Sequence, residues 1–140
     1  MSAPPERSRF KTVLLVDDSR FDNLVHERLI IRSGLCEHLE VYPNGKLAID
    51  ALADPNHENA HQLAETDLIL LDINMPILDG FGFLKRFPEL TPTLTQRVNV
   101  VILTSYINLE DKRRSSESPF VAGYINKPLT EDKLAELADL

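Results

Sequence analysis

The feature that most constrains the fold is the apolar run Leu-Ile-Leu-Leu at residues 68–71, which ends at Asp72. A run this dense is typical of a strand buried on both faces, and such strands belong to parallel sheets covered by helices. Ligands of open α/β sheets bind outside the carboxyl ends of the strands, so its position makes Asp72 a candidate site residue. An Asp after a strand is also a common turn former, and Asp72 taken alone does not separate the two interpretations.

Other segments of similar character are predicted to be strands: residues 12–16, 39–42, 98–103 and 121–125. Helices are predicted between them, because capping residues and apolar residues at helical spacing follow the strands. The helices are expected at residues 19–34, 44–53, 81–87, 108–118 and 130–140, whereas residues 54–66 should be a helix end with a loop and residues 88–97 a loop. The helix at 108–118 has only Leu109 as a strong apolar anchor, so it should be weakly held.

The alternation of strand and helix predicts an α/β fold, a doubly wound, flavodoxin-like sandwich with helices on both faces of a five-stranded parallel sheet. The expected strand order is 2-1-3-4-5, which brings Asp17, Asp18 and Asp72 into one crevice at the carboxyl edge of the sheet. We expect one domain over residues 12–140, after a disordered N-terminal tail at residues 1–11 that is polar and contains two prolines.

Composition restricts the classes of partner. The chain has 15 basic and 22 acidic side chains and a net charge of −7, which argues against direct nucleic-acid binding and favours cations. A single cysteine excludes an internal disulfide and is typical of a cytoplasmic protein. No apolar run approaches the ~18 residues that a membrane span needs. The four histidines show no metal-ligand arrangement and are expected on the surface or in loops.

The three carboxylates predict a metal site. Asp17, Asp18 and Asp72 would repel one another unless a cation lay between them. Mg²⁺ prefers oxygen ligands, and it commonly combines one or two carboxylates with phosphate oxygens and water. The backbone carbonyl of Asn74, two residues beyond Asp72, is a candidate further ligand. A site with so few protein ligands leaves room for a phosphoryl group.

Asp72 is then a candidate nucleophile, because a carboxylate can attack phosphorus to give an aspartyl phosphate. Lys127 follows the last strand and offers a positive charge, and Thr104 follows the fourth strand and offers a hydroxyl donor. A solvated lysine and an ordinary strand-end threonine are simpler interpretations of Lys127 and Thr104 taken singly. Their joint position at strand ends beside three acids favours the functional interpretation.

These motifs together resemble the receiver domain of two-component response regulators, over residues 12–140. Asp17 and Asp18 match the acidic pair that holds magnesium in that family. Asp72 matches the phosphoacceptor, and Asn74 matches the residue whose carbonyl ligates the metal. The resemblance implies that Mg²⁺ is the cofactor.

The same resemblance extends to the switch residues. Thr104 matches the switch hydroxyl, Lys127 the phosphate-binding lysine, and Tyr124 the aromatic switch position of the family. Pro128 matches a proline that follows a cis peptide bond in receivers. A half-buried strand tyrosine is the simpler interpretation of Tyr124, and it is compatible with a switching role.

The resemblance implies a signalling switch rather than an enzyme with an external substrate. A sensor histidine kinase or a phosphotransfer protein would phosphorylate Asp72, and slow self-catalysed hydrolysis would reset it. The family's fourth helix, fifth strand and fifth helix form the face that a downstream protein target would bind. A homodimer is also compatible with the resemblance, whereas direct nucleic-acid or membrane binding is not expected.

The sequence departs from the family pattern in two places. The span from Asp18 to Asp72 is longer than is usual for receivers, with the excess expected in residues 54–66. Tyr106 is bulky at a position where water must approach the phosphoryl group. No output domain is expected after Leu140, so we expect either a free-standing regulator or a receiver cut from a longer protein.

Two alternatives stay open at this point. The first is a magnesium-dependent phosphatase with an aspartate nucleophile, although such enzymes place a second acid where this chain has Asn74. The second is an adaptor with the receiver fold that is never phosphorylated. It is disfavoured because every expected site residue is present.

Overall fold

The computed structural model describes residues 8–75 and 77–140. Its single five-stranded sheet is parallel throughout, with the order β2-β1-β3-β4-β5. The strands are β1 (Phe10–Val16), β2 (Cys36–Tyr42), β3 (Thr66–Leu71), β4 (Asn99–Thr104) and β5 (Val121–Asn126). The predicted fold class and strand order are confirmed.

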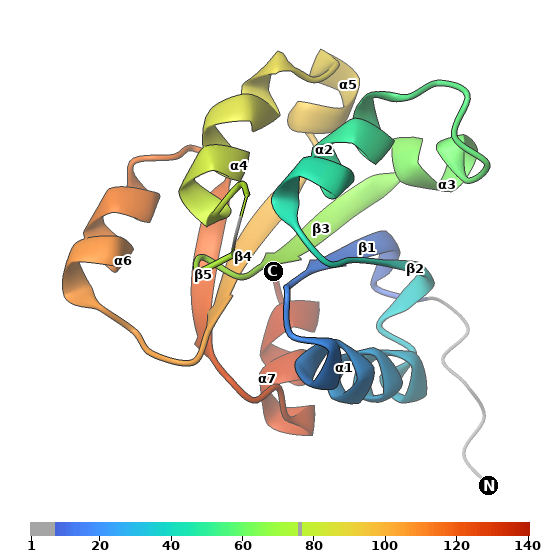
Figure 1. The fold of residues 1–140 in the computed structure, drawn as a ribbon. Coiled ribbons are helices and arrows are strands. Elements are labelled where there is room, and N and C mark those ends of the chain that lie inside the picture. The colour runs from blue at the N-terminus through green and yellow to red at the C-terminus, as the bar shows by residue number, and fades with distance from the viewer. Residues whose placement is uncertain (1–7, 76) are drawn as a thin grey trace, which may run out of the picture.

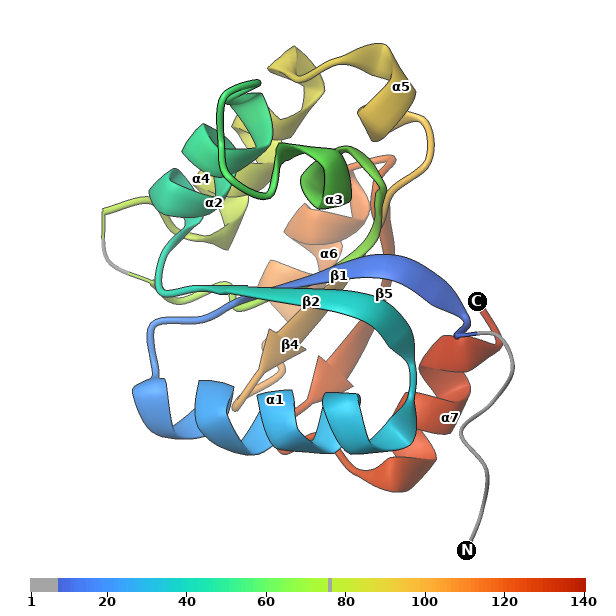
Figure 2. The same cartoon turned by 90° about the vertical axis from the view of Figure 1, so that its right-hand side faces the viewer.

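Helices cover both faces of the sheet (Figures 1 and 2). One face carries α1 (Arg20–Ser33) and α7 (Glu131–Ala138), and the other carries α2 (Gly45–Ala53), α4 (Gly80–Arg86) and α6 (Leu109–Ser116). Two short helices, α3 (Ala60–Ala64) and α5 (Pro92–Thr95), and a 3₁₀ turn at Phe87–Glu89 complete the second layer. Among the residues that the structure describes, no helix combines the length and apolar character needed to span a bilayer.

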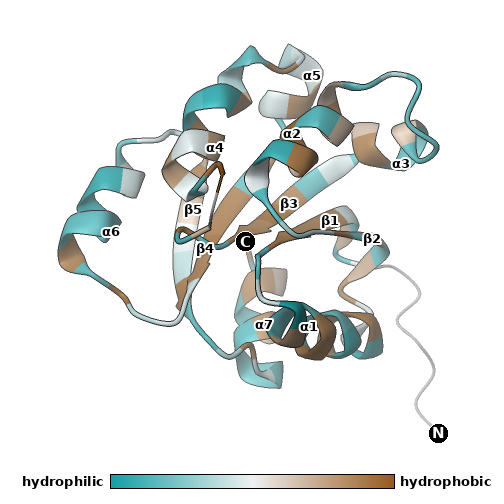
Figure 3. Ribbon diagram, viewed as in Figure 1, coloured by the Kyte–Doolittle hydropathy of each residue, from teal (hydrophilic) through white to brown (hydrophobic). Residues whose placement is uncertain are grey.

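Apolar residues follow one another along most of β3 and β4, as Figure 3 shows, and they pack on both faces of the sheet. Leu68 and Leu70 pack with α1 and α7, whereas Ile69 and Leu71 pack with α2 and α4. All four side chains are fully buried. Full burial of one such side chain contributes roughly 1.5–3 kcal/mol. Because β3 places two of these side chains in each core, it is the central strand of both cores.

The first strand begins earlier than predicted. Phe10 is buried and its backbone N–H donates to the carbonyl of Leu35 at 3.0 Å, so β1 includes two residues assigned to the tail at residues 1–11. Residues 10 and 11 therefore belong to the sheet, and the bounds of one domain over residues 12–140 stay a prediction. The remaining predicted tail at residues 1–7 is outside the described residues.

Two predicted loops contain short helices. Helix α3 lies within residues 54–66, α5 lies within residues 88–97, and the 3₁₀ turn at Phe87–Glu89 overlaps the start of the second segment. All three elements are too short to show helical periodicity in the sequence. The 54–66 segment is also fastened to the sheet edge, because the side-chain amide of Asn59 donates to Glu40 on β2 at 3.1 Å.

Helix α1 is confirmed with both of its predicted ends. The Ser19 hydroxyl accepts the backbone N–H of Asp22, and Gly34 ends the helix with a left-handed φ of 70°. The buried residues of this helix are Asn23, His26 and Ile30, however, whereas most of its large apolar side chains face outward. The surface position expected for His26 was wrong, because only 2% of this residue is exposed.

Candidate functional site

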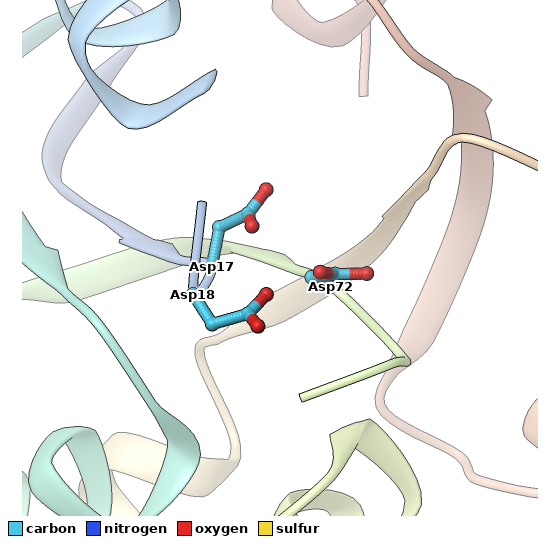
Figure 4. Close-up of side chains that lie close together, drawn as sticks. All are labelled: Asp17, Asp18 and Asp72. Carbon is cyan, nitrogen blue, oxygen red and sulfur yellow. The ribbon is translucent and has the colours of Figure 1, made fainter. Parts of the chain in front are cut away.

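The carboxyl ends of β1 and β3 bring Asp17, Asp18 and Asp72 together (Figure 4). One carboxylate oxygen from each lies within 4.8 Å of the others, as the sequence predicted. Asp17 and Asp72 are buried and Asp18 is exposed. The backbone N–H of Asp72 donates to Val16 at 2.9 Å, which fixes the two strand ends side by side.

Lys127 extends into this acidic cluster from the loop after β5. Its Nζ lies 2.5 Å from Asp17 Oδ2, 3.0 Å from Asp22 Oδ2 and 3.8 Å from Asp72 Oδ2. Burial alone would lower the pKa of Lys127, but its interactions with Asp17 and Asp22 dominate and raise it. The lysine is therefore a charged partner of the site rather than a solvated surface residue.

One lysine does not neutralise the cluster. Burial of the carboxyl group, followed by the negative charge of Asp17, raises the pKa of Asp72 to about 7. The Oδ2 atom of Asp17 is fully buried and lies 2.5 Å from Lys127 Nζ, the same ammonium group that Asp72 approaches at 3.8 Å. Three crowded carboxylates beside a single lysine form a donor set that fits a hard divalent cation such as Mg²⁺.

Hydrogen bonds fix the described residues at the two ends of the turn after Asp72. The backbone N–H of Asn74 donates to Asp72 Oδ1 at 3.2 Å, and the N–H of Gly80 donates to Ile73 at 2.8 Å. A Cβ atom on Gly80 would lie 2.8 Å from the carbonyl oxygen of Asp72, and Cβ atoms in proteins essentially never approach another heavy atom so closely. The absence of a side chain at Gly80 thus allows α4 to begin directly against the candidate phosphoacceptor.

We expect Gly80→Ala to lower the free energy of unfolding by about 1–3 kcal/mol, because backbone atoms must move to relieve the overlap. Gly123→Ala on β5 is the matched control, since a Cβ atom there meets nothing within 4 Å. That control should change stability by less than about 0.5 kcal/mol. Urea unfolding of both variants measures the difference, and equal midpoints would show that the close approach does not matter.

Thr104 ends β4 beside Lys127. The carbonyl of Thr104 accepts the backbone N–H of Lys127 at 2.7 Å, so the two residues are directly linked. The buried Thr104 hydroxyl donates to the carbonyl of Tyr106 at 3.1 Å and accepts the Tyr106 N–H at 3.3 Å. The hydroxyl is therefore held by the β4–α6 loop in this structure.

Tyr124 lies half-buried on β5 and contacts α6. Its hydroxyl donates to the carbonyl of Lys112 at 2.6 Å. The prediction that Leu109 anchors this helix was wrong, because 82% of this residue is exposed. The contacts that do hold α6 are the buried Ser115, the tyrosine hydrogen bond and the Arg114 guanidinium, which lies 4.0 Å from the Phe81 ring centroid. The prediction of a weakly held helix agrees with these few contacts.

Sequence reasoning missed the polar inner face of α1. The Asn23 side chain donates to the Asp17 carbonyl at 2.7 Å, and His26 Nε2 accepts the backbone N–H of Leu129 at 3.3 Å. Burial lowers the pKa of His26, so the ring is neutral at physiological pH. Positions 22, 23 and 26 lie on one side of the helix, but α1 carries charged residues elsewhere too, so polarity alone did not distinguish its inner face.

Comparison with known proteins agrees with this geometry. The chain matches the family model of the response regulator receiver domain over residues 13–139. It is 30% identical to the two-component response regulator 24 of Arabidopsis thaliana, covering 90% of this chain and 80% of that protein. This chain spans only 15% to 43% of the length of three longer relatives that it matches.

Two solved structures are similar in both sequence and shape. The phosphorylated cyanobacterial phytochrome response regulator RcpA is 29% identical with a TM-score of 0.71, covering 92% of this chain and 89% of that one. The Mn²⁺-bound response regulator Rcp1 is 30% identical with a TM-score of 0.68, covering 91% and 88%.

Proposed function

Because the chain belongs to the response regulator receiver family, we propose that it is a signalling switch operated by phosphorylation of Asp72. The observation that carries this proposal is the convergence of Asp17, Asp18, Asp72 and Lys127 at the ends of three strands. Similarity to one phosphorylated and one metal-bound receiver supports it.

In the proposed reaction, a carboxylate oxygen of Asp72 attacks the phosphorus of a phosphohistidine. The P–N bond of the donor breaks, and its electron pair stays on the imidazole nitrogen. Asp17, Asp18, Asp72 and the Asn74 carbonyl would hold a Mg²⁺ ion, which when bound would neutralise the charge of the transferring group. Lys127 and the Thr104 hydroxyl are placed to donate to the phosphoryl oxygens, and hydrolysis of the aspartyl phosphate would reset the switch.

The proposed signal passes through Thr104 and Tyr124. A phosphoryl group on Asp72 would compete with the Tyr106 backbone for the Thr104 hydroxyl. Movement of that hydroxyl frees space next to β5, and inward rotation of Tyr124 would break its hydrogen bond to Lys112. Since α6 has few other anchors, this loss would shift the helix.

The surface formed by α6, β5 and α7 is therefore the proposed output face, and it corresponds to the face named from the family resemblance. A sensor histidine kinase or a phosphotransfer protein is the proposed donor, and a downstream protein is the proposed target. Self-catalysed transfer and hydrolysis are the only proposed chemistry. A homodimer and a cytoplasmic location stay predictions.

Incubation with acetyl phosphate and Mg²⁺, followed by intact-mass measurement, tests the proposal. We expect one labile phosphoryl adduct, and none when EDTA removes the metal. Steady turnover of many phosphate esters would instead support the phosphatase alternative. A folded protein that never gains an adduct would support the unphosphorylated adaptor and overturn the switch.

We expect Tyr106→Ala to shorten the lifetime of the phosphorylated state several-fold. The Tyr106 side chain is 74% exposed and follows Thr104 by two positions, so it can obstruct water approaching the phosphoryl group. Loss of the adduct over time, followed by mass spectrometry after donor removal, measures the lifetime. Tyr106→Phe retains the ring and serves as the control, and an unchanged lifetime in the alanine variant would contradict this role.

A further inference from the structure

We propose that Asp22 is a positioning residue that takes up Lys127 when a divalent cation occupies the carboxylates of Asp17 and Asp72. This inference rests on the proposed function, because it concerns metal binding at the same site. It assigns a role to an acid that lies outside the cluster of three carboxylates.

The geometry places Asp22 beside the lysine but apart from the metal ligands. Lys127 Nζ donates to Asp22 Oδ2 at 3.0 Å, while it also lies 2.5 Å from Asp17. The Asp22 side chain is 32% exposed, whereas that of Asp17 is fully buried. Lys127 therefore has one deeply buried anionic partner and one at the rim of the site.

The backbone around Asp22 is fixed independently of its carboxylate. The Asp22 N–H donates to the Ser19 hydroxyl, and the next residue, Asn23, donates from its side chain to the carbonyl of Asp17. Neither hydrogen bond uses the Asp22 side chain. An Asp22→Asn substitution thus removes the charge and leaves the start of α1 in place.

Competition between cations gives Asp22 its role. An ammonium group 2.5 Å from Asp17 Oδ2 occupies an oxygen that a divalent cation would also use, and the two like charges repel. Binding of the metal must displace Lys127 from that oxygen. With Asp22 present, the lysine keeps a charged partner within its reach, which lowers the cost of displacement.

Calorimetric titration with Mg²⁺ alone tests this proposal. We expect the Mg²⁺ dissociation constant of Asp22→Asn to rise roughly threefold to tenfold, which is the effect of a coupling between neighbouring charged groups. Asp22→Glu keeps the charge and should bind Mg²⁺ nearly as tightly as the wild type. Glu27→Gln removes one negative charge from the same helix and should change the dissociation constant less than twofold.

A double-mutant cycle separates action through Lys127 from general electrostatics. In a Lys127→Gln background, the added Asp22→Asn substitution should no longer weaken Mg²⁺ binding. Equal weakening in both backgrounds, or equal weakening by Glu27→Gln, would overturn the proposal. If Lys127→Gln does not fold, the comparison of Asp22→Asn with Glu27→Gln decides alone. Failure of the wild type itself to bind Mg²⁺ would count against the proposed function instead.

Discussion

The Asp72→Asn variant is expected to gain no phosphoryl group from acetyl phosphate under conditions that modify the wild type. An amide is a poor nucleophile, and no other carboxylate occupies the position of Asp72 at the end of β3. Intact-mass measurement with Mg²⁺ present gives the result directly. Asp139→Asn, a substitution of an exposed acid at the end of α7, should be modified to the wild-type extent.

The Asp72→Asn substitution should also stabilise the metal-free protein at neutral and alkaline pH. The pKa of Asp72 rises from 3.8 to about 7 on folding, so its contribution to stability is fully present below pH 3.8 and is lost as the pH rises through 7. The asparagine side chain does not ionise and avoids this loss, which amounts to at most about 4 kcal/mol.

Urea unfolding in EDTA at several pH values measures this effect. The wild type should lose stability relative to Asp72→Asn between about pH 4 and pH 7, since that is the interval between its unfolded and folded pKa values. Added Mg²⁺ should reduce the gap at pH 8 by stabilising the wild type. A constant difference across this pH range would contradict the raised pKa of Asp72 that burial and the charge of Asp17 cause.

Replacing Lys127 with alanine should make folding depend on magnesium. The substitution leaves the carboxylate of Asp17 buried without its cationic partner, and breaking a buried ion pair from one side costs about 3–5 kcal/mol. We expect this loss in EDTA and a large recovery with Mg²⁺, because the metal can neutralise the same carboxylates. With the metal present, Lys127→Ala should therefore retain the fold.

Lys46→Ala is the matched control for this variant. Lys46 pairs with Asp50 on the exposed surface of α2, and such pairs contribute about 0.3–0.5 kcal/mol.

The switching role of Lys127 gives a second expectation. With Mg²⁺ present, phosphorylation should no longer change the binding of Lys127→Ala to its partners. A variant as stable as the wild type in EDTA, with an unaltered response to phosphorylation, would contradict both the electrostatic and the switching role of Lys127.

The sheet was predictable because its strands carry a signal that does not depend on their neighbours. The continuous apolar run at residues 68–71 indicates burial on both faces, and parallel strands place their carboxyl ends at one edge. The convergence of Asp17, Asp18 and Asp72 follows from that topology. The cis peptide bond between Lys127 and Pro128, expected from the family resemblance, is also confirmed.

The inner face of α1 was not predictable from apolar periodicity. Phe21 and Ile31 suggest an inward apolar stripe, yet they are 75% and 62% exposed. Asn23 and His26 face inward because this helix packs beside loops whose buried backbone groups require polar partners. Such partners depend on where the β5–α7 loop lies in space, and residue spacing within the helix does not contain that information.

Mapping the modified residue tests the central claim most directly. Wild-type protein treated with acetyl phosphate and Mg²⁺ can be reduced with borohydride, which cleaves acyl phosphates, and then digested and sequenced by mass spectrometry. The account predicts reduction at Asp72 alone, in proportion to the adduct measured beforehand. Reduction at Asp17 or Asp18, or an adduct on a histidine with Asp72 unmodified, would contradict it.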